Sequence, residues 1–239
     1  MIGILKCDTI IDLNLKSFGD YDEIFRNFLN LKEKDIKCFD CVNNEFPTDH
    51  ELDVYGGFII SGSSFSVYEH HEWMENLKDL IIKMDEMNVN LLGICFGHQI
   101  IANAFGCPVE ENPEGWEVSL STIKLNDAGQ ELFNRKQLRL HQMHKDIVTD
   151  VPEDTGLKVT ASNNKTEIQG LSKDDHIITL QGHPEYFDDI IENFFKEKAD
   201  IIPEKVIEEG REKFNKSNSE KFLSKFFKKF LKKEFIIYV

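Results

Sequence analysis

The 239-residue sequence contains no long apolar run and comparatively few basic residues. No segment approaches the roughly 18 to 20 apolar residues that a membrane-spanning helix needs, so no such helix is expected. The N-terminal stretch MIGILKCDTIIDLN is apolar but has no basic head, and it is expected to form a buried strand rather than a signal peptide. Lys and Arg total 28 against 43 Asp and Glu, a formal net charge of -15. This acidity disfavours nucleic acid and anionic membrane surfaces as partners, since both repel acidic proteins.

Cysteine is also scarce and irregularly spaced. The five cysteines do not form the even, closely spaced framework of a disulfide-rich secreted domain, so a reducing, cytoplasmic compartment is expected. Cys38 and Cys41 make a Cys-x-x-Cys pair, but no second pair of ligands at zinc-binding spacing accompanies them. No Gly-rich phosphate loop is present either. These patterns predict neither a metal site nor an organic cofactor.

The first half of the chain alternates between apolar strands and amphipathic helices. Such alternation predicts an α/β fold with a mainly parallel central sheet and helices on both faces. No internal repeat and no Pro/Gly/Ser-rich linker divides the chain, so one domain spanning residues 1–239 is expected. Strands are predicted at 3–7, 36–42, 57–61 and 89–94, and helices at 21–34, 71–87 and 98–106.

Beyond residue 107 the pattern changes to short strands and then to helices. The last 50 or so residues read as mostly helical, and residues 218–235 form a Lys/Phe amphipathic helix. A basic face opposite Phe and Leu is typical of a membrane-surface helix. In a protein this acidic, a terminal helix that covers the core is the favoured interpretation. The short strands are predicted at 117–125, 138–143, 157–161, 167–171 and 176–180.

The stretch GICFGHQ (93–99) joins an apolar strand to an apolar helix through a Gly-x-Cys-x-Gly turn. A nucleophile exposed at the top of a parallel sheet needs such a sharp turn, and glycines at 93 and 97 remove side chains that would clash across it. The turn places Cys95 at a helix N-terminus, which favours the thiolate. The backbone N–H of Phe96 would then face the oxygen of a carbonyl under attack. A small buried cysteine is the alternative, but it would not require flanking glycines.

The segment ITLQGHPEY (178–186) supplies a base and a group to orient it. Pro184 favours an extended conformation at His183, and residues two apart in an extended stretch point to the same side. His183 and Glu185 are therefore expected to lie side by side, with the carboxylate holding the imidazole. Cys95, His183 and Glu185 together predict a catalytic triad for nucleophilic catalysis.

GICFGHQ, QGHPEY and the chain order Cys…His-x-Glu resemble the class I, triad-type glutamine amidotransferases. Within them the sequence is similar to the stand-alone branch near GMP synthase glutaminase domains, which includes the plant γ-glutamyl peptidases. The resemblance implies a flavodoxin-like fold and a single amidotransferase domain over 1–239. Its C-terminal helical extension would cover about 188–235.

Two further segments gain a role from this resemblance. IISGSSFSVYE (59–69) resembles the family loop that supplies the second oxyanion donor. That donor would be the backbone N–H of Ser63, with Gly62 beside it in the substrate site. The family usually has glycine where Ser63 stands, and a positive φ there would cost a serine about 1 kcal/mol.

HQMHKDIV (141–148) resembles the family's Ser-His-Gly-Asp segment, which lines the pocket for the glutamyl α-carboxylate and α-amine. The resemblance implies substrate-binding roles for Met143, His144 and Asp146, with the acidic Asp146 facing an α-ammonium. Lys145 would alter selectivity at the α-carboxylate end. Gln99 matches the family residue that contacts the glutamine substrate.

The resemblance implies a cysteine hydrolase or transferase that cleaves a γ-glutamyl amide bond, in glutamine or a γ-glutamyl peptide, through a Cys95 thioester. No segment resembles a synthetase domain that would accept the nitrogen. A stand-alone γ-glutamyl peptidase is therefore favoured. The alternatives are a glutaminase subunit that supplies ammonia to a separate synthetase such as GMP synthase, and a non-catalytic relative that keeps Cys95 as a redox-sensitive thiol.

Overall fold

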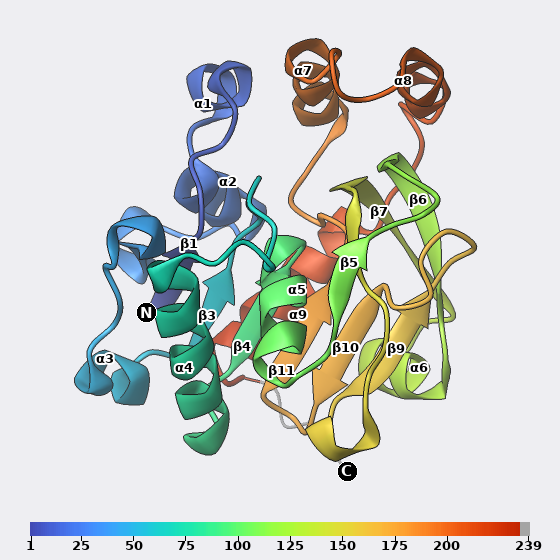
Figure 1. The fold of residues 1–239 in the computed structure, drawn as a ribbon. Coiled ribbons are helices and arrows are strands. Elements are labelled where there is room, and N and C mark those ends of the chain that lie inside the picture. Colours follow the sequence, from blue (N-terminus) through green and yellow to red (C-terminus); the bar gives the residue numbers. More distant parts are fainter. Residues whose placement is uncertain (235–239) are drawn as a thin grey trace.

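The computed structural model describes residues 1–234, and the strands of this range form one large sheet and one small one (Figure 1). In chain order the strands are β1 (Ile2–Lys6), β2 (Ile36–Asp40), β3 (Gly57–Ile60), β4 (Leu91–Ile94), β5 (Val109–Glu111), β6 (Glu117–Leu125), β7 (Gln137–His144), β8 (Asp146–Val148), β9 (Lys158–Ser162), β10 (Gly170–Lys173) and β11 (Ile177–Leu180). The helices are α1 (Asp12–Phe18), α2 (Tyr21–Phe28), α3 (Asp49–Val54), α4 (Glu72–Glu86), α5 (Phe96–Ala104), α6 (Asp127–Phe133), α7 (Asp188–Glu197), α8 (Glu204–Arg211) and α9 (Glu220–Leu231).

The large sheet is mixed, with a parallel half and an antiparallel half. Its strand order is β2-β1-β3-β4-β11-β10-β9-β6-β7, and β5 pairs with β8 in the small sheet. The pairs from β2 through to β11 are parallel, whereas those from β11 to β7 are antiparallel. The predicted α/β fold with a parallel core is confirmed, as are the short antiparallel strands that follow it.

Alternate residues of the parallel strands enter two apolar layers, one on each face of the sheet. On β4, for example, Leu92 and Ile94 pack in one layer and Leu91 packs in the other. The first layer holds buried residues of α2 and α9, and the second holds those of α4 and α5. Strands buried on both faces read as continuous apolar runs, which explains why segments such as GFII were recognisable in the sequence.

Helix α9 covers the core, as the favoured interpretation of the Lys/Phe segment predicts. Leu223, Phe227 and Phe230 are buried in the same apolar layer as α2. The backbone carbonyl of Phe230 accepts a hydrogen bond of 2.6 Å from Asn90 Nδ2 in the turn before β4. Residue 235, the predicted end of this helix, lies outside the described residues. Within residues 1–234, no helix is long and apolar enough to cross a membrane.

Several boundaries differ from the prediction. The helix predicted at 21–34 ends at Phe28, because the chain turns through Asn30 in a left-handed conformation (φ 48°). The strand predicted at 36–42 ends at Asp40, and the strand predicted at 167–171 forms at 170–173. Helices α1, α3 and α6 were not predicted, because six- and seven-residue helices carry too little periodicity to stand out.

Candidate functional site

Cys95 lies in the sharp turn between β4 and α5. Its φ of 54° and ψ of -105° lie outside the common regions for a residue with a side chain. Two close approaches hold the turn in place: a Cβ on Gly93 would lie 2.6 Å from the Gly97 carbonyl oxygen, and a Cβ on Gly97 would lie 2.4 Å from that of Ile60. The glycines are therefore required by close packing, and a strained backbone at the residue between them is typical of functional sites.

The start of α5 leaves a backbone donor next to the Cys95 side chain. The first N–H groups of a helix have no acceptor within the helix. The N–H of Gly97 donates instead to the Ser61 carbonyl at 3.1 Å, whereas Phe96, one residue earlier, has its side chain fully buried against Trp73. The N–H of Phe96 is thus the donor expected to face a developing oxyanion, as the turn motif predicts.

His183 and Glu185 lie together directly after β11. Nδ1 of His183 is 2.7 Å from Oε1 of Glu185, and both side chains are almost completely buried. The backbone N–H of His183 donates to the His141 carbonyl on β7 at 2.7 Å, which anchors the segment to the far strand of the sheet. The expected side-by-side arrangement of His183 and Glu185 is therefore present.

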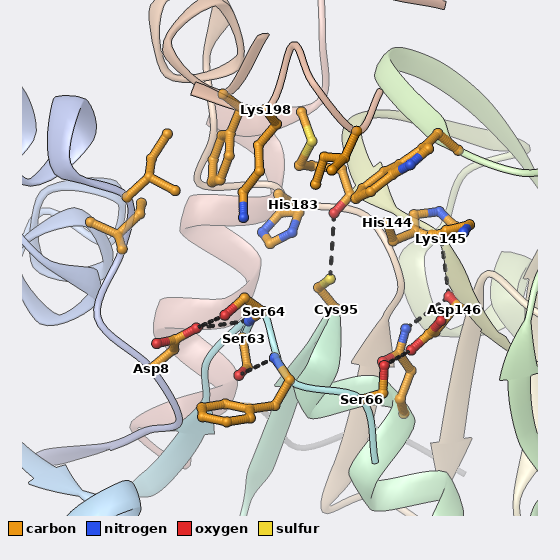
Figure 2. A pocket seen from close by; sticks show the side chains of 18 of the residues that line it. Asp8, Ser63, Ser64, Ser66, Cys95, His144, Lys145, Asp146, His183 and Lys198 are labelled. Atoms are coloured by element: carbon orange, nitrogen blue, oxygen red, sulfur yellow. Dashed lines mark hydrogen bonds between the residues drawn. The ribbon is translucent and has the colours of Figure 1, made fainter. Parts of the chain in front are cut away.

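The electrostatics of this pair favour a charged imidazole. Burial alone would lower the pKa of His183, but the negative charges of Glu185 and of the Cys95 thiolate outweigh it and raise that pKa to about 10. An imidazolium beside a thiolate is the resting state that thiol-based acyl transfer uses. In the neutral form the Cys95 thiol points to the Met143 carbonyl, with Sγ and O 4.0 Å apart (Figure 2).

Cys95 and His183 open into one cavity of about 320 Å³ (Figure 2). This volume is near the lower end of the roughly 300–1,000 Å³ that small-molecule sites occupy. Gly62, Phe96 and Glu185 are not among its lining residues. Six of the other sequence-predicted residues line it together with Cys95 and His183: Ser63, Gln99, Met143, His144, Lys145 and Asp146.

The loop that carries Ser63 is tied down by its own side chains. The hydroxyl of Ser63 donates to the Cys7 carbonyl at 3.0 Å and accepts from the N–H of Phe65 at 3.1 Å. Asp8, directly after β1, accepts from the N–H of Ser64 at 2.8 Å. The φ of Ser63 is not positive. The strain expected for a serine at this position is therefore absent, and its hydroxyl braces the loop.

The carboxylate of Asp146 faces the cavity from the start of β8. It accepts hydrogen bonds from the hydroxyls of Ser66 and Tyr68, the latter at 3.1 Å, and both donors belong to the loop of Ser63. Gln99 Nε2 donates to the Asp146 backbone carbonyl at 2.8 Å. Gln99 thus positions the Asp146 segment, a role that the sequence did not indicate.

His144 is held from behind by a buried carboxylate. Its Nε2 lies 3.5 Å from Oε2 of Glu117 on the neighbouring strand β6. Burial would raise the pKa of Glu117, but hydrogen bonding and the charge of His144 lower it to about 2. Asn163 and Gln169 donate to the same carboxylate at 2.6 and 2.9 Å. His144 is therefore a fixed wall of the cavity.

Several lining residues were missed at the level of the sequence. Asp8 follows a parallel strand at its carboxyl end, and that position alone could have indicated it. Trp116 and Lys198 carry no motif and enter the cavity only through the tertiary fold. Among residues 1–234, no group of three or more His, Cys, Asp or Glu side chains is arranged to hold a metal ion.

The elbow, the His-Pro-Glu segment and the parallel sheet recur together in a known family. The family model for class-I glutamine amidotransferases matches residues 23–196. This chain belongs to that family. The matched region begins in α2 and ends in α7, so it includes the whole parallel half of the sheet apart from β1.

Individual amidotransferases of this family agree with the assignment. Gamma-glutamyl peptidase 4 of Arabidopsis thaliana is 36% identical over 74% of this chain and 72% of its own length. A subunit of the glutamine-hydrolysing GMP synthase of Saccharolobus solfataricus is 33% identical over 72% of this chain and 80% of its own. A crystal structure of a glutamine amidotransferase from Thermotoga maritima superimposes with a TM-score of 0.70, covering 100% of this chain and 99% of that one, at 20% identity. The resemblance noted in the sequence is confirmed.

Proposed function

We propose that the protein cleaves γ-glutamyl amide bonds, with Cys95 as nucleophile, His183 as acid and base, and Glu185 as the group that orients the imidazole. One observation carries the proposal. The strained elbow directs Cys95 into the cavity that His183 also lines, and His183 in turn holds a 2.7 Å hydrogen bond to the buried Glu185. Nucleophile, base and orienting carboxylate are the three parts that covalent acyl transfer requires.

The reaction proceeds in two balanced steps. The Cys95 thiolate attacks the γ-carbonyl carbon, and the N–H groups of Ser63 and Phe96 stabilise the oxyanion. As the C–N bond breaks, the His183 imidazolium gives its proton to the leaving nitrogen, which departs as ammonia or an amine. The neutral imidazole then takes a proton from water, and the hydroxide attacks the thioester to release glutamate and regenerate the thiolate.

The charges around the cavity suit the glutamyl end of such a substrate. Asp146 presents a carboxylate to an α-ammonium, and the donors Ser66 and Tyr68 fix its orientation. Lys145 Nζ is 2.7 Å from Glu111 Oε1, so its charge is already paired at the cavity edge. Gly62, Gln99, Met143 and His144 complete the proposed substrate site.

A γ-glutamyl peptidase is the favoured activity, supported by the likeness to the Arabidopsis gamma-glutamyl peptidases. The second candidate is a glutaminase subunit that passes ammonia to a separate synthetase, supported by the likeness to a subunit of a GMP synthase. For either, residues 1–239 are proposed to form one amidotransferase domain with its helical extension from about residue 188, because strands from both halves share one sheet. The cytoplasmic location stays a prediction.

A substrate panel tests the proposal. Purified protein is incubated with glutamine, glutathione and γ-glutamyl dipeptides, and released glutamate and ammonia are measured. We expect turnover of γ-glutamyl peptides without a partner, a loss of at least about 1,000-fold in Cys95→Ala, and retention in the control Cys38→Ala, whose thiol lies outside the cavity. Release of neither product from any substrate would argue for the non-catalytic alternative.

A second measurement separates the two enzymatic candidates. A glutaminase subunit should be almost inactive alone and should gain activity when its synthetase is added, because ammonia release is then coupled to its use. A peptidase should reach the same kcat with or without added protein. Full activity in Cys95→Ala would overturn the nucleophile assignment in both cases.

A further inference from the structure

Lys198 reaches the cavity from the C-terminal end of α7. It is half-buried and lines the cavity, and Figure 2 shows its amine directed inward on the His183 side of Cys95. Its backbone is held firmly: the N–H donates to the Phe194 carbonyl at 2.8 Å, and its own carbonyl accepts from Ile201 and Ile202 at 3.0 and 2.9 Å. The direction of the side chain is thus set by the end of the helix.

The Lys198 amine has no hydrogen-bond or ion-pair partner among residues 1–234, although the cavity contains several carboxylates. Each of those has a partner of its own. Glu111 pairs with Lys145 at 2.7 Å, and Asp146 accepts from two hydroxyls. Asp8 accepts from the N–H of Ser64 at 2.8 Å. Lys198 therefore presents an uncompensated positive charge to whatever fills its side of the cavity.

The neighbouring cavity wall is apolar. Ile11, Trp116, Phe194 and Ile201 line the same cavity. Helix α1, which follows Ile11, is tied to α7 by hydrogen bonds through Asn14, at 3.2 Å to the Ile190 carbonyl and 2.9 Å from Asn193. A cation beside apolar side chains is more weakly screened than one in open water, so it binds an anion more strongly.

The two ends of the cavity carry opposite charges, with Cys95 between them in Figure 2: Asp146 on one side and Lys198 on the other. His183, which protonates the leaving nitrogen in the proposed reaction, lies on the Lys198 side. We propose that Lys198 binds a carboxylate carried by the leaving group. The substrates would then be γ-glutamyl peptides in which the amine released is an amino acid or short peptide with a free carboxylate.

This inference rests on the proposed function and narrows it. Glutamine releases ammonia, which offers Lys198 nothing to bind, whereas a γ-glutamyl amino acid places a carboxylate a few bonds beyond the scissile nitrogen. The apolar wall would receive the side chain of the leaving residue. Charge-assisted hydrogen bonds of this type contribute enough to change binding by about tenfold or more.

A matched pair of substrates tests the inference: γ-glutamyl-alanine and γ-glutamyl-alaninamide, which differ in one carboxylate. We expect wild-type protein to prefer the acid by at least about tenfold in kcat/KM, mainly through KM. In Lys198→Met the preference should fall to about one, and in Lys198→Arg it should persist. The control is Lys196→Met, which removes an exposed lysine of the same helix outside the cavity and should keep the wild-type preference.

The outcomes separate the two proposals. If wild type cleaves neither compound nor any other γ-glutamyl substrate, the proposed function and this inference both fail. If it cleaves acid and amide equally well, or if Lys198→Met lowers kcat/KM for acid, amide and glutamine by the same factor, only the inference fails. The last result would assign Lys198 to the glutamyl α-carboxylate instead. Thermal unfolding of each variant checks that the fold is retained.

Discussion

The phenol ring of Tyr186 lies face to face on the imidazole of His183, with 3.9 Å between ring centroids and 2° between ring planes. Tyr186 is itself fully buried and contacts Phe194 of α7, with 5.6 Å between centroids. The imidazole is therefore held by three independent restraints: the stack on Tyr186, the hydrogen bond to Glu185 and the backbone bond to His141. Such restraint keeps Nε2 aimed into the cavity.

Replacing Tyr186 tests the contribution of this stack. Tyr186→Leu should lower kcat about 10- to 100-fold with little change in KM, because a small misplacement of the imidazole impairs proton transfer more than binding. Tyr186→Phe keeps the ring and should stay within a few-fold of wild type. Steady-state kinetics on a γ-glutamyl peptide provide the measurement. Equal losses in both variants would assign the effect to the hydroxyl rather than to stacking.

Replacing Glu185 should alter the pH profile as well as the rate. The carboxylate raises the pKa of His183 against the opposing effect of burial, so its removal should lower that pKa. In Glu185→Gln we expect kcat to fall by roughly 100- to 10,000-fold. The alkaline limb of kcat/KM, which reports loss of the imidazolium proton, should move to lower pH. An alkaline limb that stays in place would contradict the proposed coupling of these two residues.

The stability of the protein should depend on pH through its buried histidines. Burial lowers the pKa of His98 to about 3 and that of His141 to about 4, in His98 with the charge of His144 adding to the effect. Between these values and the ordinary value near 6.5, the unfolded chain binds more protons than the folded chain. Their contribution to stability is complete above about pH 6.5 and is lost as the pH falls.

His183 acts in the opposite direction. Its folded-state pKa is raised to about 10, so its contribution is complete below about pH 6.5 and is lost as the pH rises towards 10. Denaturant unfolding followed from about pH 4 to 9 should therefore show a maximum near pH 6.5. His141→Gln should flatten the acidic slope, while the exposed control His50→Gln should leave it unchanged. An acidic slope that survives in His141→Gln would contradict the assignment.

The parts of this protein that were readable in the sequence are those whose physics is local. Apolar runs predicted the strands of the parallel core, since these are buried on both faces. The turn around Cys95 was recognisable because its close packing demands glycine at 93 and 97. Pro184 set the geometry that places Glu185 beside His183.

The parts that were not readable depend on the path of the whole chain. Glu117 reads as one more residue of a strand, yet it supports His144 on a different strand, because β6 and β7 pair at that register. Lys198 lies among many helical lysines, and only the packing of α1 on α7 turns it towards the cavity. Gln99 was expected to touch substrate, but the structure gives its amide to the backbone of Asp146.

Gly97 at the start of α5 and Gly106 just after its end separate steric overlap from backbone strain. A Cβ on Gly97 would lie 2.4 Å from the rigid Ile60 carbonyl, whereas Gly106 has open space around it but a φ of +89°. Gly97→Ala should therefore destabilise the protein by about 1–3 kcal/mol and disturb the elbow, with loss of activity. Gly106→Ala should cost about 1 kcal/mol and leave activity intact. Gly106→Asn should recover much of that loss, since asparagine tolerates the left-handed conformation, but Gly97→Asn should recover none. Chemical denaturation and peptidase assays on the four variants provide the measurement, and equal behaviour of the two asparagine variants would show that overlap with Ile60 is not what requires Gly97.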